Sequence, residues 1–114
     1  MRQITFKGKR IDNGEWVEGY LNGWITDNKQ VRAIITPEEV FIVTPETVGQ
    51  YVCTINSGEI YEGDINEEGG VCKYFDFEFK WSYGKNLPTR RIQRNDVAMG
   101  NIHDNPELLN KINN

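Results

Sequence analysis

The residues best suited to bind a ligand lie in one short basic stretch. Arginine and lysine bind phosphate groups, and tryptophan and tyrosine rings offer flat surfaces on which bases stack. Between positions 80 and 94 the chain has five basic residues and no acidic one. The candidate ligand-binding residues are Trp81, Tyr83, Lys85, Arg90, Arg91 and Arg94. The alternative is a loop whose arginines pair with acidic side chains of the same fold.

A second candidate is a metal-binding loop at 64–69. The segment Asp64-Ile65-Asn66-Glu67-Glu68-Gly69 resembles the opening of a calcium loop, with ligands at positions 1, 3 and 5 and glycine at position 6. Position 12 of such a loop falls on Phe75, which cannot coordinate calcium, and no helices are expected to flank the segment. We therefore predict a solvated hairpin here, with no metal and no cofactor.

Nucleophilic catalysis would require a cysteine beside a histidine. The chain has two cysteines, Cys53 and Cys72, and one histidine, His103. No residue pattern indicates a third group to orient the histidine. A phosphate-binding loop, a dinucleotide fingerprint and zinc-ligand spacing are also absent from the sequence. We predict no catalytic residue and no enzymatic activity, and we expect both thiols to be reduced.

Size and composition indicate a small folded domain. The 114 residues include 26% charged and 38% hydrophobic residues, both ordinary for a globular chain. No apolar run approaches the roughly 20 residues that span a bilayer, so we expect a cytosolic protein without membrane contact. The net charge of −4 argues against a general nucleic-acid binder. The charge is also segregated, since residues 33–72 include eight acidic residues and no basic one.

Short alternating segments predict β-strands in the N-terminal half. Asp12-Asn13-Gly14 is typical of a tight hairpin turn between two such segments. The run Val40-Phe41-Ile42-Val43 is apolar without alternation, which favours a strand covered on both faces. Because a small domain has few elements to supply that cover, we predict that the protein self-associates through Phe41 and Val43. The N-terminal hairpin folding over the run is the alternative.

The longest alternation runs from Val71 to Trp81. It predicts one strand whose core face carries Val71, Lys73, Phe75, Phe77, Phe79 and Trp81. Near the end of the chain, Asn105-Pro106-Glu107 has the residue types of a helix start. A short helix is therefore predicted at 105–112.

The stretch Ile60-Tyr61-Glu62-Gly63-Asp64-Ile65 predicts a corner where the sheet turns over itself. Gly63 permits a backbone conformation that a Cβ would forbid, and the carboxylate of Asp64 is short enough to bind neighbouring backbone N–H groups. The fold class is thus mainly β, with small antiparallel sheets and a short C-terminal helix. We predict a single domain at 1–114, with N-terminal strands at 1–50, a barrel-like part at 51–104 and the helix after it.

This corner also contributes to a family resemblance. Together with Gln50-Tyr51 and the later segment Gly100-Asn101-Ile102-His103-Asp104-Asn105-Pro106-Glu107-Leu108-Leu109, it resembles the YopX family of phage and prophage proteins. The resemblance implies a β-rich fold whose C-terminal part is similar to an SH3-type barrel. It also implies a phage-derived accessory protein, in the cytoplasm of a bacterial host, with no established biochemical role. It transfers no catalytic residue.

Two classes of function follow from the sequence. The first is a non-catalytic interaction module that binds itself, as a homo-oligomer, or a host protein. The second is a protein that binds or sequesters a nucleotide or a nucleic acid through the basic stretch at 81–94. We favour the first.

Overall fold

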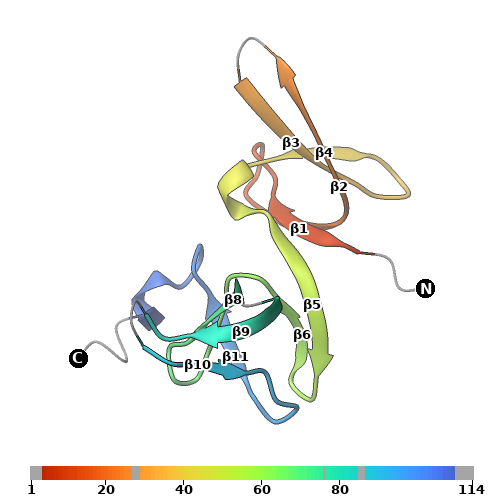
Figure 1. Ribbon diagram of the computed structural model, residues 1–114. Helices are drawn as coiled ribbons and strands as arrows, with labels where there is room; N and C mark the ends of the chain where they lie inside the picture. The colour runs from red at the N-terminus through yellow and green to blue at the C-terminus, as the bar shows by residue number, and fades with distance from the viewer. Residues whose placement is uncertain (1–3, 27–28, 76, 85–86, 110–114) are drawn as a thin grey trace. The chain divides into compact units, whose positions relative to one another are not determined.

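The computed structural model describes residues 4–26, 29–75, 77–84 and 87–109, and it confirms a mainly β fold built of antiparallel sheets. The chain divides into two compact units, Met1–Tyr51 and Val52–Asn114. Figure 1 shows the strands of each unit. Each unit has its own buried core, so each is described by itself.

The first unit contains the first four strands of a six-stranded antiparallel sheet. Its strands are β1 (Phe6–Lys9), β2 (Trp16–Thr26), β3 (Lys29–Ile35) and β4 (Val40–Val43), hydrogen-bonded in the order β4-β3-β2-β1. Gly14 has a φ of 74° in the turn between β1 and β2, which confirms the predicted hairpin. After a 3₁₀ turn, η1 (Pro45–Thr47), the strand β5 (Gly49–Ile55) pairs with β1 through Gly49 and Gln50.

The outer edge of β4 is joined to the residues around the end of β1. Val43 forms a β-bridge with Arg10. The Ile11 N–H donates to the Ile42 carbonyl oxygen at 3.1 Å, and the Thr44 N–H donates to the Lys9 carbonyl oxygen at 2.8 Å. These bonds satisfy backbone groups that an edge strand would otherwise expose. The end of the N-terminal hairpin therefore pairs with the edge of this apolar strand.

The second unit contains a five-stranded antiparallel sheet. Its strands are β7 (Asp64–Asn66), β8 (Val71–Phe75), β9 (Glu78–Ser82), β10 (Thr89–Arg91) and β11 (Ala98–Asn101), in the order β10-β9-β8-β7-β11. This sheet is open, so the barrel that the family resemblance implied is not closed here. The later part of β5 pairs with β6 (Gly58–Tyr61). Ile60, Cys72 and Trp81 form the buried centre of the unit.

The corner between β6 and β7 has the predicted geometry. Gly63 has a φ of 95°, and its N–H donates to the Cys72 carbonyl oxygen at 2.9 Å. Asp64 Oδ2 accepts a hydrogen bond from the Tyr61 N–H at 2.8 Å and is itself buried. A buried carboxylate that accepts a backbone N–H fixes the turn around it. Both predicted roles at this corner are confirmed.

The predicted single strand over 71–81 is wrong. Phe75 pairs with Glu78, so the segment is a hairpin of two strands, β8 and β9, joined at residues 76 and 77. Phe77 is 93% exposed and has a φ of 69°. Its ring is therefore not part of the core, and Phe75 is also exposed. Trp81 and, partly, Phe79 pack in the core as expected, whereas Val71 is buried on the opposite face of the hairpin, where it pairs with Ser82.

The predicted C-terminal helix is of the 3₁₀ type where the structure describes it. The structure has a 3₁₀ helix, η2 (Pro106–Leu109), and residues 110–112 of the predicted helix lie outside the described residues. The Leu108 N–H donates to the Asn105 carbonyl oxygen at 3.1 Å, the spacing of a 3₁₀ turn. Among the described residues, no helix has the length and apolar character needed to cross a membrane.

Candidate interaction surfaces

Trp81, the aromatic centre of the predicted basic stretch, is a core residue. Its side chain is fully buried and its Nε1 donates to Asp96 Oδ2 at 2.8 Å. A ring with no exposed face cannot stack on a base. The structure therefore corrects the role of this residue from ligand contact to core packing.

Tyr83 and Arg90 belong to a polar network within the same unit. The Tyr83 hydroxyl accepts hydrogen bonds from Asn66 Nδ2 at 3.0 Å and from Arg90 Nε at 3.3 Å, and it donates to Glu68 Oε1 at 3.1 Å. Arg90 Nη2 also lies 3.2 Å from Glu68 Oε1 and 3.1 Å from Asp96 Oδ1. For Arg90, the alternative of pairing with acidic residues of the same fold is what the structure shows.

Asp96 accepts a hydrogen bond from Trp81 and forms an ion pair with Arg90, so it belongs to the same network. Its Oδ2 accepts from the Gln93 N–H at 2.7 Å as well as from Trp81. Burial alone would raise the pKa of Asp96, but the hydrogen bonds from Gln93, Trp81 and Arg90 together hold it below its ordinary value of 3.8. Asp96 is therefore a carboxylate that stays charged and fixes the turn before β11.

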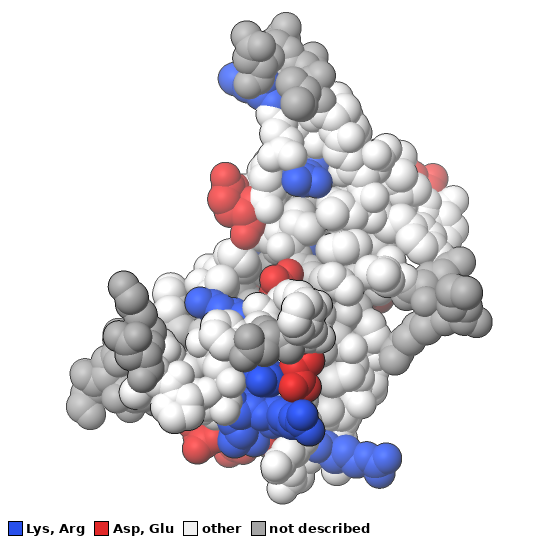
Figure 2. Space-filling model, viewed as in Figure 1, with Lys and Arg blue, Asp and Glu red and all other residues white. Residues whose placement is uncertain are grey.

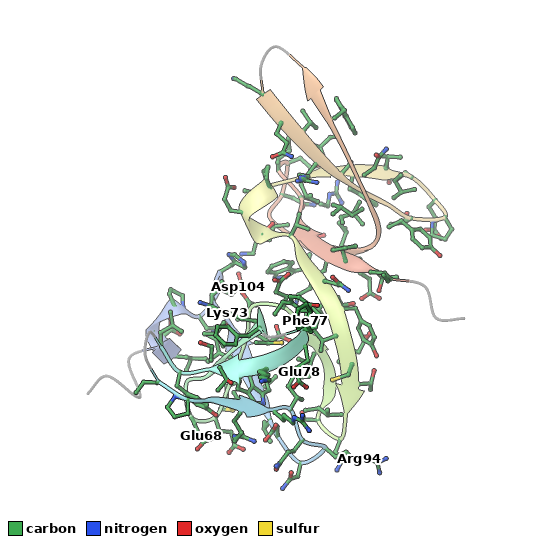
Figure 3. The ribbon with its side chains drawn as sticks, viewed as in Figure 1. Glu68, Lys73, Phe77, Glu78, Arg94 and Asp104 are labelled. Carbon is green, nitrogen blue, oxygen red and sulfur yellow. The ribbon has the colours of Figure 1, made fainter. Side chains whose placement is uncertain are left out.

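The remaining basic residues do not gather around Trp81. Arg91 is exposed and its Nε lies 3.4 Å from Glu78 Oε1, whereas Arg94 is exposed in the turn after β10. Figure 3 shows Lys73, Phe77 and Glu78 on the β8–β9 hairpin and Arg94 well away from them. Lys85 lies outside the described residues. The predicted stretch is thus split between the core network, the outer face of the sheet and a separate turn, and nucleotide binding stays a prediction.

The outer face of β8, β9 and β10 brings together cations from three strands. Lys73 pairs with Lys80, and Lys80 pairs with Arg91, so the three side chains stand side by side across the sheet. Glu78 Oε1 lies 3.6 Å from Lys80 Nζ and is also the partner of Arg91. Figure 2 shows basic atoms gathered over this part of the second unit, with acidic atoms at their border. We call Lys73, Lys80 and Arg91 the cation row.

An open groove of about 820 Å³ adjoins the cation row. Lys73 lines the groove and is also the first residue of the cation row. The apolar side chains that line the groove come from β8, from the loop before β10, and from the segment after β11; they are Val71, Phe75, Leu87, Ile102 and Leu109. We call this the β8 groove.

In the first unit, the residues predicted for self-association lie on the inner side of the sheet. Val43 is 1% exposed and packs against Gly8. A Cβ added to Gly8 would lie 3.0 Å from Val43 Cγ2. Phe41 is half-buried, with the Arg10 guanidinium 4.5 Å from its ring centroid. Val43 is therefore corrected from an interface residue to a core residue, and Phe41 is largely covered by its own chain.

The opposite side of that sheet has several exposed apolar side chains, with the polar Asn22 among them. Tyr20, Ile35 and Val40 are directly paired across β2, β3 and β4, and Trp24 is paired with Val31. Tyr20, Trp24 and Val40 are 45%, 42% and 54% exposed. We call Tyr20, Trp24, Val31, Ile35, Val40 and Ile42 the β2–β4 face. Ala33 lies among these larger side chains and is buried.

Cys72 and Asn66, which were considered for catalysis and for metal binding, are both buried. Burial raises the pKa of Cys72 to about 12, so its thiol stays protonated and is a poor nucleophile. In the segment considered as a calcium loop, Asn66 Oδ1 accepts from the Glu68 and Gly70 N–H groups, so it holds the turn. Among the described residues, no cluster of three histidine, cysteine or acidic side chains is placed to hold a metal ion.

The two segments that carry the family resemblance meet in the structure. The Ile102 N–H donates to the Gly63 carbonyl oxygen at 3.0 Å. Asn101 Oδ1 accepts from the N–H groups of His103 and Asp104, which shapes the turn after β11. These residues hold the backbone, so the resemblance rests on structural positions. Comparisons with protein-family models, curated proteins and solved structures give no match for this chain, and its membership of the YopX family stays a prediction.

No local pattern in the sequence indicates the cation row, because its members come from three different strands. Lys73 and Lys80 fall on one face only if a two-residue connection joins β8 to β9. A hairpin could have been predicted from the two short apolar segments that flank Asp76. However, aspartate followed by phenylalanine is not a typical hairpin turn. The β2–β4 face could have been found from the alternation of Tyr20 and Trp24 along one strand.

Proposed function

We propose that this protein is a non-catalytic interaction module that self-associates through the β2–β4 face. The observation that carries the proposal is the exposure of Tyr20, Trp24 and Val40 on one side of a continuous sheet. Exposed apolar side chains that lie together on a small protein mark an interaction site. Aromatic residues are also enriched at the centres of protein interfaces.

A second copy of the chain is the simplest occupant of this face. An apolar sheet face is complementary to itself, and two-fold pairing lets each copy cover the same residues of the other. Val40 and Ile42 are then covered in the oligomer, while Phe41 and Val43 are covered within each copy. This arrangement explains why all four residues of β4 are apolar although only two face the core.

The resemblance to phage and prophage proteins supports a similar role. It suggests an accessory protein in the cytoplasm of a bacterial host, where binding rather than catalysis is the activity. The inert Cys72 thiol is consistent with this view. A host protein that presents an apolar surface is the competing occupant of the β2–β4 face.

Light scattering tests the proposal directly. We expect the parent chain to have a mass that is a multiple of 13.2 kDa at micromolar concentration. Val40→Glu should convert it to a monomer, because a carboxylate buried in an apolar interface is costly. Phe77→Glu is the matched control, since it places the same charge on an exposed apolar residue of the other unit.

Two results would contradict self-association. One is a parent mass near 13 kDa up to high micromolar concentration. The other is an oligomer that Val40→Glu leaves intact. Circular dichroism should show that each variant keeps the β-sheet content of the parent, so that loss of mass reports the interface and not unfolding.

A further inference from the structure

We propose that the second unit binds an acidic, extended segment of a partner protein, with carboxylates on the cation row and an aliphatic side chain in the β8 groove. This site is separate from the β2–β4 face and takes a different partner.

The cation row places like charges directly opposite each other on neighbouring strands. Like charges directly opposite each other on neighbouring strands destabilise a sheet. Here Lys73 faces Lys80 and Lys80 faces Arg91, while Glu78 is the only described carboxylate paired with any of the three. The three cations and Glu78 together have a net charge of about +2, on a chain whose net charge is −4. Local arrangements that cost stability are expected where they serve a function.

The spacing of the row fits an extended acidic segment. Neighbouring strands lie about 4.8 Å apart, so Lys73 and Arg91 are separated by about 10 Å across β9. In an extended segment, side chains two residues apart point the same way and lie about 7 Å apart. Two carboxylates at alternate positions can therefore both reach the row, with Glu78 left as partner to the remaining charge.

The groove indicates a protein partner. Four aliphatic side chains line it together with the rings of Phe75 and Tyr83, and Lys73 at the start of the row also lines it; the aliphatic ones are Val71, Leu87, Ile102 and Leu109. An aliphatic side chain beside acidic ones is common in proteins, whereas a nucleic acid offers mainly bases and phosphates. The ring of Trp81, which would have been the stacking surface for a base, is buried. Protein binding is therefore the better fit for this combination of groove and charge.

A labelled peptide tests the site on the full chain. The probe is a fluorescein-labelled nine-residue peptide of glycine and serine, in which one leucine and two glutamates occupy alternate positions. Fluorescence anisotropy should show saturable binding that weakens as salt is added. Replacing both glutamates by glutamine should weaken binding about fivefold to tenfold, and replacing the leucine by alanine about tenfold.

Matched protein variants locate the binding. We expect the double variant Lys73→Gln, Arg91→Gln to weaken binding at least about fivefold. Arg94→Gln should leave it unchanged, because Arg94 is an exposed cation away from the row. Lys73→Gln should not lower the denaturation midpoint, because it removes a like-charge pair. Val40→Glu should bind the peptide as the parent does, which separates this site from self-association.

Three outcomes would overturn the proposal. The glutamate and glutamine peptides would bind equally or not at all. The Arg94→Gln control would lose as much affinity as the double variant. Alternatively, an oligothymidylate of equal charge would bind more tightly than the acidic peptide and depend on the same lysine and arginine, which would make the row a nucleic-acid site.

Discussion

The two units of this protein each have a small β-sheet core, but the two cores are built from different types of residue. In the first unit the buried centre is aliphatic, with Ile34 packed against Gly19 and Val43 packed against Gly8. In the second unit a single large residue, Trp81, packs with the smaller Ile60 and Cys72, and the polar residues Asp64 and Asn66 are buried in the same unit.

The difference lies in what fixes the backbone. In the second unit, buried polar side chains accept hydrogen bonds from turn N–H groups, so individual oxygen atoms hold the corners. In the first unit, backbone bonds from Ile11 and Thr44 join β4 to the end of β1. We therefore expect the first unit to respond mainly to changes in side-chain volume, and the second to respond also to single polar atoms and to pH.

The largest effect is expected at Trp81. Trp81→Ala should lower the free energy of unfolding by about 4 kcal/mol, because it removes the largest buried side chain and leaves a cavity. Trp81→Phe keeps much of the side-chain volume but removes the hydrogen bond to Asp96. Loss of that bond should lower the free energy of unfolding by about 1–3 kcal/mol, in addition to the effect of lost packing. Urea denaturation followed by circular dichroism measures both variants.

Ile34→Val in the first unit is the matched control for that experiment. Ile34 is fully buried in an aliphatic environment, and loss of one methyl group should cost about 1 kcal/mol. If Trp81→Phe were no more costly than Ile34→Val, the hydrogen bond to Asp96 would contribute nothing, and the proposed difference between the two cores would fail.

The next effect is a dependence on pH that originates in the second unit. Because the pKa of Asp96 is lower in the folded protein than its ordinary value of 3.8, its charged form stabilises the fold above about pH 4. That contribution is lost as the pH falls through the lowered pKa. Asp96→Asn should therefore destabilise the protein at pH 7, and its difference from the parent should shrink below pH 4.

Asp12→Asn provides the comparison in the first unit. The hydrogen bond from Arg10 lowers the pKa of Asp12 as well, but this pair lies on the surface, where solvent screens it. Its removal should change the unfolding midpoint much less than Asp96→Asn does at pH 7. Equal changes for the two variants, measured at several pH values, would show that the buried network has no special effect.

The same contrast explains how much of the structure the sequence could predict. The mainly β class, the Asn13-Gly14 hairpin and the corner at Gly63 and Asp64 follow from local residue types, because each depends on neighbouring atoms only. The inner face of β4 could not be predicted, since four consecutive apolar residues fit either register. Its pairing with β3, where Ile34 lies opposite Phe41, decides that Phe41 and Val43 face inward.

The candidate surfaces depend even more on register. The alternation of Val71, Lys73 and Phe75 continues through Phe77 to Trp81 in the sequence, so it predicts one strand. The two-residue connection between Phe75 and Glu78 shifts the alternation by one residue, which puts Trp81 in the core and Lys80 beside Lys73. The cation row exists only because of that shift.

The smallest effect is expected at Phe77, and it tests the shift directly. As part of a core face, this residue would contribute about 3 kcal/mol or more, which Phe77→Ala would remove. As a turn residue that is 93% exposed with a φ of 69°, it contributes little packing and adopts a conformation unfavourable for a residue with a Cβ. Phe77→Gly should therefore change the free energy of unfolding by less than about 1 kcal/mol, with the variant the more stable. A loss near 3 kcal/mol in urea denaturation would show that Phe77 packs in the core. The register between β8 and β9, on which the cation row depends, would then be wrong.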